Sequence, residues 1–174
     1  MMVLKILGKL IKILRSNASP GQIAWGFALG TFLGFTPLMS LHNLGIVFLI
    51  FIMNVNISAA LFGWLLCGLL AFFLDPFFHT IGFGVLVQIG FLKPFWTAFY
   101  NAPIAPLTRF NNTVVMGSFV FSLIAFVPGY FLFRKFVVVY RTSWNEKLQK
   151  MKFFQIFKGS KFVQLYFKVR NMGD

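Results

Sequence analysis

Residues 19–37 read SPGQIAWGFALGTFLGFTP and contain one complete helix with its start and stop signals. Ser19 is a good N-cap residue, and Pro20 has the fixed backbone angle that suits the first turn. At the other end, Pro37 lacks an amide donor and pushes Thr36 out of the helical region. The sequence therefore predicts a short apolar helix from about Gly21 to Phe35.

Three glycines recur inside this helix at four-residue spacing, namely Gly26, Gly30 and Gly34. They lie nearly on one helix face, where the backbone of another helix can approach closely. In a helix surrounded by water, three interior glycines would be destabilising. The pattern favours a helix that packs inside a membrane.

The composition of the whole chain also favours a membrane environment. Of its 174 residues, 59% are hydrophobic and only 11% are charged, whereas a soluble domain has about 25% charged residues. Between Ser16 and Phe133 the only charged side chains are Asp75, Lys93 and Arg109. So few charges cannot cover a globule with a polar surface.

The remaining charges gather at the two ends of the chain and are basic apart from Glu146 and Asp174, which gives a net charge of +13. A basic protein can bind nucleic acid. Here the basic ends flank a membrane-sized apolar core, so anionic lipid headgroups are the better partner and no nucleic acid is expected.

The chain continues after Pro37 with His42 and Asn43 and then a second apolar run, residues 45–53. At about 1.5 Å per residue, neither this run nor the first helix comfortably covers a hydrocarbon core of about 30 Å. Two short helices around a polar tip predict a re-entrant hairpin. Two tilted spans, or spans in a thinned membrane, are the alternative.

Two further segments are long enough to cross a membrane. Residues 57–74 form the first, which we expect Asp75-Pro76 to end, with residues 77–90 as a separate apolar piece. Residues 91–111 mix prolines with aromatic residues and suggest a segment at the headgroup level. Residues 112–133 form the last span, with a kink expected at Pro128-Gly129.

Amphipathic segments are expected at both ends. In residues 2–15 the basic side chains occupy about a third of the helical wheel, which predicts an interfacial helix; a soluble helix docked on a partner is the alternative. Residues 144–170 suggest one or two surface-lying helices. The expected contacts with anionic lipid are Lys5, Lys9, Lys12, Arg15, Lys147, Lys150, Lys158, Lys161 and Lys168.

These segments predict an all-α, polytopic membrane protein in three parts: residues 1–18, 19–142 and 143–174. Because basic residues are retained on the cytoplasmic side, we expect both termini there and an even number of crossings, two or four. Residues 91–111 are then placed on the periplasmic side, although Lys93 and Arg109 count against this placement.

The residues quoted above resemble a bacterial membrane family catalogued as a domain of unknown function, number two-zero-six-two. The resemblance covers roughly residues 19–135. Its further motifs, which fit a stand-alone subgroup, are Leu41-His42-Asn43-Leu44, Asn54-Val55-Asn56, Asp75-Pro76-Phe77-Phe78-His79 and Thr108-Arg109-Phe110-Asn111-Asn112. The resemblance implies the inner membrane of a Gram-negative bacterium and supplies no activity. Some relatives are fused to glycosyltransferases, which hints at envelope lipid or polyprenyl-sugar chemistry.

The candidate polar membrane site consists of Asp75, His79, Arg109 and His42. An ionisable side chain at membrane depth is a functional hypothesis, and Asp75 and His79 are four residues apart, with Arg109 or Lys93 as a counter-ion. The plainer interpretation, an Asp-Pro turn in water that ends a helix, is favoured because Asp-Pro is a strong turn signal. With two histidines and one cysteine, Cys67, we expect no metal, no cofactor and no catalytic residue.

Three functions remain open. The first is a non-enzymatic inner-membrane subunit that anchors or assists an envelope complex, for example one that moves lipids. It would have a larger membrane or periplasmic partner or form a homo-oligomer. The second is a small transporter or lipid scramblase that works through re-entrant hairpins. The third, a membrane enzyme on lipid-linked substrates, is the weakest because a single acid is available for acid–base chemistry.

Overall fold

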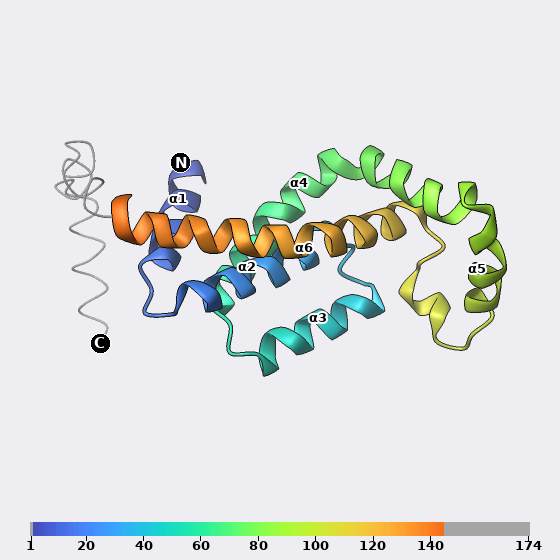
Figure 1. The fold of residues 1–174 in the computed structure, drawn as a ribbon, viewed down its shortest axis with the longest axis horizontal. Coiled ribbons are helices and arrows are strands. Elements are labelled where there is room, and N and C mark those ends of the chain that lie inside the picture. Colours follow the sequence, from blue (N-terminus) through green and yellow to red (C-terminus); the bar gives the residue numbers. More distant parts are fainter. Residues whose placement is uncertain (1, 145–174) are drawn as a thin grey trace. The chain divides into compact units, whose positions relative to one another are not determined.

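A computed structural model describes residues 2–144 of the chain; of residues 2–5, 7 and 144 it describes the backbone alone. The chain divides into two compact units, residues 1–137 and 138–174. Every regular element in the described range is helical, so the expected all-α class is confirmed. The α-helices are α1 (Met2–Leu14), α2 (Pro20–Phe35), α3 (Leu41–Ile52), α4 (Ile57–Phe83), α5 (Lys93–Tyr100) and α6 (Thr113–Val139) (Figure 1).

Helix α2 has the ends that the sequence predicts. The Ser19 hydroxyl accepts a hydrogen bond from the Gln22 amide at 3.2 Å, and the Ser19 amide donates to the Gln22 side chain at 2.8 Å. This reciprocal pair satisfies two amides that a helix start leaves without partners. The helix ends at Phe35, where Thr36 takes an extended conformation.

The glycines of α2 face α4 of the same chain. A Cβ added to Gly26 or Gly30 would overlap the backbone carbonyl of Asn56 or Ala60, and one added to Gly34 would lie 2.7 Å from the Trp64 carbonyl oxygen. Gly63 of α4 makes the corresponding contact with α2, because a Cβ added to it would lie 2.6 Å from the Phe27 carbonyl oxygen. Because the contacts on both helices advance together, α2 and α4 run parallel and touch backbone to backbone.

Helix α3 connects these two parallel helices. It runs back alongside α2 (Figure 1) and buries Ile50 in a cluster with Leu29, Leu33 and Ala60. The helix begins at Leu41 rather than near Gly45, so its first turn includes His42 and Asn43. Asn43 is buried there, and its contacts with the end of α2 stabilise the extra turn.

Helix α4 corrects the expected break at Asp75-Pro76. The helix passes through Pro76 to Phe83 and continues as a π-helical turn, η1 (Gly84–Gln88). Proline removes one backbone donor, but the flanking turns remain helical because Phe78 and Gly82 pack tightly on α6. A Cβ on Gly82 would lie 2.9 Å from the Gly117 nitrogen, and Phe78 is fully buried. The consequence of Pro76 is at most a bend, and Figure 1 shows α4 following an arched course.

Helix α6 runs antiparallel to α2 and is held to it by aromatic pairs. The ring centroids of Trp25 and Tyr130 lie 4.7 Å apart, those of Phe27 and Phe133 lie 3.7 Å apart, and those of Phe32 and Phe119 lie 5.8 Å apart. Offset and tilted aromatic pairs of this kind add to the energy of apolar burial. The helix extends to Val139, beyond the expected end at Phe133, and contains Pro128 without ending there.

Residues 90–111 form a folded cap between α4 and α6. They contain a short 3-10 turn η2 (Gly90–Leu92), helix α5 and a second 3-10 turn η3 (Ala105–Thr108). Ala105 and Phe110 are buried with Met116 of α6, and the Trp96 indole donates to the Val85 carbonyl at 3.1 Å. The mixture of prolines and aromatic residues in residues 91–111 thus marks the place where long helices give way to short helices and turns.

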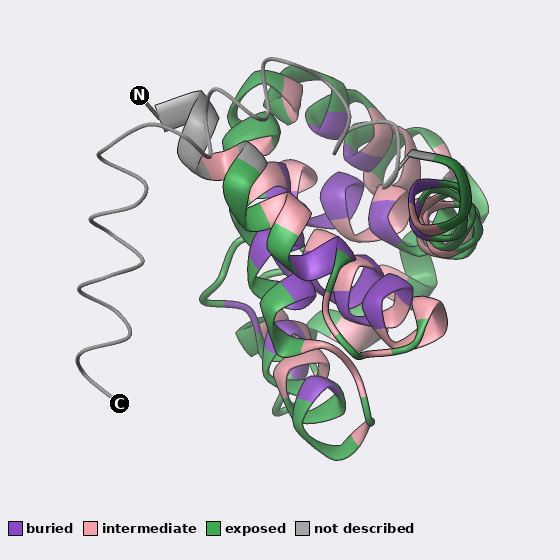
Figure 2. Cartoon of the chain, turned by 90° about the vertical axis from the view of Figure 1, so that its left-hand side faces the viewer, coloured by how far each residue is buried: buried purple, intermediate pink, exposed green. Residues whose placement is uncertain are grey.

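Two stretches are long and apolar enough to cross a membrane, Ile57–Gln88 and Thr113–Ser143. In each, only 28% of the most apolar window is buried within the chain. Figure 2 shows the buried residues where helices face one another and the exposed residues on the outer sides. Most of the apolar side chains of these two helices therefore face outward.

Helix α1 is helical as predicted, and its last turn is docked on the rest of the unit. Ile13 and Leu14 are buried. Just after the helix, the Ser16 hydroxyl oxygen accepts a hydrogen bond at 3.3 Å from the side chain of Asn56, the N-cap residue of α4. The surface helices expected in residues 144–170 lie outside the described residues from residue 145 onwards.

Candidate functional site

The turn between α2 and α3 contains a buried polar cluster that the sequence did not single out: Thr36, Ser40 and Asn43, all at most 5% exposed. We call residues 36–43 the hairpin tip. The Thr36 hydroxyl donates to the Asn43 side-chain oxygen at 2.7 Å and lies 2.8 Å from the Phe32 carbonyl. These contacts join the last turn of α2 to the first turn of α3.

The carbonyl of Pro37 completes the cluster. It accepts one hydrogen bond from the side-chain amide nitrogen of Asn43 at 2.9 Å and another from the Ser40 hydroxyl at 2.8 Å. Buried polar groups are costly unless they are paired, and this arrangement pairs them within one tight turn. The tip is thereby ordered although it lies between two apolar helices.

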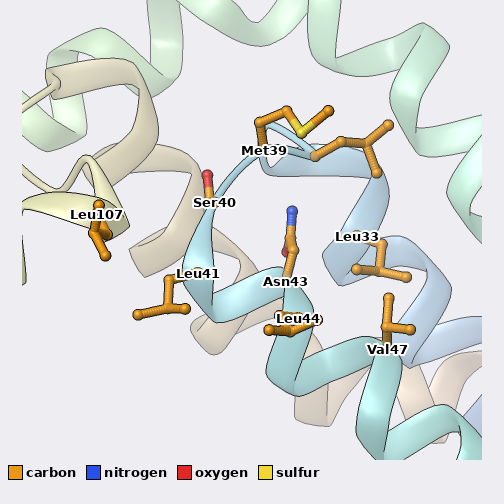
Figure 3. Close-up of a pocket in the computed structure, with 9 residues that line it drawn as sticks. Leu33, Met39, Ser40, Leu41, Asn43, Leu44, Val47 and Leu107 are labelled. Atoms are coloured by element: carbon orange, nitrogen blue, oxygen red, sulfur yellow. The ribbon is translucent and has the colours of Figure 1, made fainter. Parts of the chain in front are cut away.

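A hollow of about 380 Å³ opens beside the hairpin tip (Figure 3). Its walls are apolar, with Leu33, Leu44 and Val47 on one side and Met39 and Leu41 towards the tip, while Asn43 supplies the buried amide. Leu107 of η3 closes one end, so the cap formed by residues 90–111 reaches the tip. Met39 is 82% exposed and Leu38 is 56% exposed, so the tip is apolar on its outer side.

The tip lies beside the middle of α4 rather than at an end. A second hollow of about 290 Å³ is lined by Thr36 and Leu38 from the tip and by Trp64, Leu65 and Leu69 from α4. Helix α4 begins at Ile57 and the continuous helical stretch ends at Gln88. The α2–α3 hairpin thus covers only the first part of this stretch.

His42 points from the tip towards α6. Its ring centroid is 5.1 Å from that of Phe119 and 6.3 Å from that of Phe32, both in edge-on geometry. The Nε2 atom is buried without a hydrogen-bond partner among the described residues, and so is the Ser122 hydroxyl of α6. No charged side chain takes part in these ring contacts.

Of the other three members of the expected polar site, Asp75 and His79 lie one turn apart on α4, and Arg109 lies in the turn before α6. Asp75 is exposed on α4 and forms no ion pair within residues 2–144, with Arg109, Lys93 or any other side chain. The Nδ1 atom of His79 lies 2.7 Å from the Thr113 hydroxyl, so this histidine joins α4 to the start of α6. Arg109 is exposed in the turn before α6 and has a left-handed backbone, with φ of 56°.

Because α4 continues through Pro76, Asp75 and His79 lie one turn apart on its exposed surface, as expected for a helix that tolerates the proline. No described side-chain contact joins any two of Asp75, His79, Arg109 and His42, and the structure places Arg109 and His42 on other elements. Within the described part of the chain, no three His, Cys, Asp or Glu side chains form a group that could hold a metal ion. Cys67 is buried as a free thiol.

The basic residues expected to contact lipid are described in part. Lys9, Lys12 and Arg15 are exposed. The side chain of Lys5 is outside the described set, as are Lys147, Lys150, Lys158, Lys161 and Lys168. Arg134 and Lys135 are exposed on α6 just after Phe133, which stacks on Phe27 in the middle of α2.

The polar cluster of the tip had a signal in the sequence. The uncharged polar residues between the two apolar runs are Thr36, Ser40 and Asn43, and the two that hydrogen-bond to each other, Thr36 and Asn43, are seven positions apart. Sequence reasoning looks first for ionisable groups at membrane depth, so it selected His42 and passed over Asn43. Whether His42 or Asn43 faces Thr36 depends on the residue at which α3 begins.

A comparison with protein-family models places the chain in one family. The family model described as "Uncharacterized protein conserved in bacteria (DUF2062)" matches residues 5–145. An uncharacterized protein of Treponema pallidum (strain Nichols) is 28% identical over 146 residues, which cover 84% of this chain and 90% of that protein. No solved structure is significantly similar to the chain.

Proposed function

We propose that this chain, which belongs to the bacterial family of uncharacterized proteins DUF2062, is a non-enzymatic inner-membrane subunit that anchors or assists an envelope complex, such as one that moves lipids. The observation that carries the membrane part is the outward-facing apolar surface of α4 and α6. A core helix of a soluble protein buries most of its apolar side chains, whereas these two helices bury 28% of their most apolar windows. Leu132 and Phe72, for example, are 69% and 77% exposed, and burying such side chains is worth about 2 kcal/mol each.

The proposed topology has two crossings and one re-entrant hairpin. Both termini lie in the cytoplasm, α4 crosses outward, residues 90–111 cap the periplasmic side and α6 returns. The α2–α3 hairpin enters from the cytoplasmic side and turns back at the hairpin tip. Its support is that the tip ends beside Trp64 and Leu69 in the middle of α4, and that Thr36, Ser40 and Asn43 are hydrogen-bonded within the tip, as polar groups away from water require.

Labelling of single cysteines tests this topology. In a Cys67→Ala background, Asn101→Cys should react with a membrane-impermeant maleimide in intact spheroplasts, whereas Asn17→Cys should react only after permeabilisation. Both native residues are exposed. Met39→Cys, at a residue of the tip that is 82% exposed, should stay protected in both conditions because the tip is surrounded by lipid. Labelling of Met39→Cys from either side without detergent would refute the re-entrant hairpin.

The role of a subunit is supported by the basic, exposed residues of α1 and the end of α6, which suit anchoring to anionic headgroups. Gentle extraction in native lipid followed by mass spectrometry should find the chain with a larger membrane or periplasmic protein, or with further copies of itself. Extraction as a monomer that carries out a transport or enzymatic reaction alone would contradict the proposal.

The hollow at the hairpin tip favours lipid scrambling as a second candidate. It is open, apolar and placed near mid-membrane in the proposed topology, with Asn43 and Ser40 as its polar groups. Purified protein in liposomes would then equilibrate a fluorescent phospholipid between leaflets faster than empty liposomes, and Leu44→Trp in the wall of the hollow would slow this exchange. Identical rates with and without protein would exclude it.

A further inference from the structure

Arg109 has a backbone conformation that is uncommon for arginine. It follows η3 with φ of 56° and ψ of 27°, in the left-handed region where glycine and asparagine are the usual residues. The turn is fixed on both sides, because Ala105 and Phe110 are buried and the Thr108 hydroxyl donates to the Ala105 carbonyl at 2.7 Å. A glycine would satisfy this turn with less strain, so the backbone does not account for an arginine here.

The exposed guanidinium of Arg109 has no counter-ion within residues 2–144. Asp75 is the one acid in that range, and the two side chains form no ion pair. A guanidinium is always charged, and its fork of donors matches a phosphate group. In the proposed topology Arg109 belongs to the cap on the periplasmic side, where the phosphates of the outer leaflet are the nearest abundant anions.

The hollow beside the hairpin tip begins two residues before Arg109. Leu107 forms one of its walls, and Figure 3 shows Leu107 across the hollow from Leu33 and Val47. The Cα atoms of Leu107 and Arg109 lie at most about 7 Å apart, so the cation is attached at the edge of the hollow. A volume of about 380 Å³ with mainly apolar walls and few polar groups is typical of small-molecule sites.

The position of the hollow suits the acyl chain of a lipid. It is bounded by the hairpin tip, near mid-membrane in the proposed topology, and by η3 of the periplasmic cap, which contacts α3. Its wall continues along α3, because Leu44 is 66% exposed and Phe48, one turn further on, is 63% exposed. A lipid with its phosphate at the cap would extend its chains in this direction.

We propose that Arg109 and the hollow together bind one phospholipid of the outer leaflet. The guanidinium holds the phosphate, and one acyl chain lies in the hollow between Leu44 and Leu107. The recognised groups are the phosphodiester and the chain, so phospholipids with different headgroups fit the same site. This inference rests on the proposed membrane topology.

Photo-labelling of the full chain in proteoliposomes tests the site. The probe is a phosphatidylcholine with a diazirine in one acyl chain, and adducts are located by mass spectrometry of peptides. We expect adducts at the hollow, on the peptides that contain Leu44 and Leu107. A diacylglycerol with the same diazirine chain lacks the phosphate and should label the hollow at least about fivefold less, the change expected for one basic residue on an anionic group. The reference is Leu132 of α6, 69% exposed, which both probes should label to within about twofold.

Substitutions separate the phosphate contact from the chain contact. Arg109→Gly should lower labelling of the hollow by about fivefold, while the unfolding midpoint in lipid-free detergent does not fall, because glycine favours the left-handed turn. Lys93→Gln removes another exposed cation of the cap and should leave labelling within about twofold of the parent. Leu44→Trp fills the hollow and should lower labelling there, whereas Ile124→Trp, at a residue that is 70% exposed on α6, should not.

Each result supports or overturns the site. Equal labelling of the hollow by both probes, or unchanged labelling with Arg109→Gly, overturns it. An equal loss with Lys93→Gln does so too, because the cap would then attract lipid without a specific contact. Displacement of the probe by excess inorganic phosphate would make Arg109 a site for a free anion instead. If the probe labels Leu132 but not the hollow, only this inference fails; if it labels neither, the proposed membrane function fails.

Discussion

Glycine spacing matters at single positions because the α2–α4 contact uses the space of missing side chains. At Gly30 a methyl group would overlap the Ala60 carbonyl, which belongs to the backbone and cannot rotate away. At Gly45 of α3 nothing lies within 4 Å of an added Cβ. Two glycines in apolar helices therefore have opposite roles, one required by packing and one not.

Gly30→Ala should lower the stability of the protein by about 1–3 kcal/mol, because the two helices must separate to admit the methyl group. Gly45→Ala should have no cost and can gain up to about 1 kcal/mol from helix propensity. The measurement is the thermal unfolding midpoint of both variants in the same detergent. Equal midpoints for the two variants would mean that α2 and α4 do not touch at Gly30.

Asn43 is the second residue whose role depends on one position. It is 2% exposed and bonds on one side to Thr36 and on the other to the Pro37 carbonyl. Asn43→Ala should destabilise the protein by about 1–3 kcal/mol, since buried polar groups lose a partner. Asn54→Ala is the control, because Asn54 is exposed and forms no side-chain hydrogen bond within residues 2–144. Thermal unfolding in detergent separates them, and a loss of stability in the control alone would contradict the buried cluster.

At the scale of elements, Asn56 performs two tasks with the two atoms of one amide. Its oxygen accepts from the Ala59 amide at 2.8 Å and caps α4, while its nitrogen donates to Ser16 at 3.3 Å and holds the end of α1. The Ser16 hydroxyl proton is already donated to the Ile13 carbonyl at 2.7 Å. An aspartate at position 56 would therefore keep the cap and lose the bond to Ser16.

We expect Asn56→Ala to lose about 1 kcal/mol of stability through the missing cap and to speed hydrogen exchange in α1. Asn56→Asp should speed exchange in α1 while the unfolding midpoint stays near that of the parent. Hydrogen–deuterium exchange of the peptide that covers residues 2–18, together with thermal unfolding, separates the two effects. Unchanged exchange in both variants would show that Asn56 does not hold α1.

The sequence predicted elements best where their signals are local. The ends of α2 follow from Ser19-Pro20 and Thr36-Pro37, because a cap and a proline act on their own turn. The expected break at Pro76 was wrong for the opposite reason. Whether that turn stays helical depends on the contact of Phe78 and Gly82 with Gly117, which lies about thirty-five residues away in the sequence.

The candidate site shows the same limit. Composition identified four ionisable groups of the apolar core, namely Asp75, His79, Arg109 and His42. Composition alone does not say how far apart these side chains lie in the folded chain. Asp75 and His79 remain neighbours on α4, four positions apart, whereas the fold places His42 in the hairpin tip and Arg109 in the turn before α6. The bond between Thr36 and Asn43 was equally invisible, because it depends on α3 beginning at Leu41.

At the scale of the whole molecule, the distribution of charge is the dominant feature. The chain has 16 basic and 3 acidic residues, and Lys9 and Lys12 are exposed on α1 and Arg134 and Lys135 on α6. Lys93 is exposed elsewhere, at the start of α5. A membrane with anionic lipids on its cytoplasmic side would hold the first group strongly and Lys93 weakly.

Replacing Lys9 and Lys12 together by glutamine should weaken the binding of anionic lipid by about fivefold for each charge removed, since a basic residue near an anionic surface contributes about 1 kcal/mol. Lys93→Gln is the matched control and should leave this binding within about twofold of the parent. The measurement is the occupancy of phosphatidylglycerol on the detergent-solubilised protein by native mass spectrometry, with phosphatidylcholine as the neutral comparison. The difference between the variants should shrink as salt is raised, because exposed charges are screened within about 8 Å at physiological ionic strength. An equal loss in the control variant, or a loss of both lipids alike, would mean that the basic end does not select anionic headgroups.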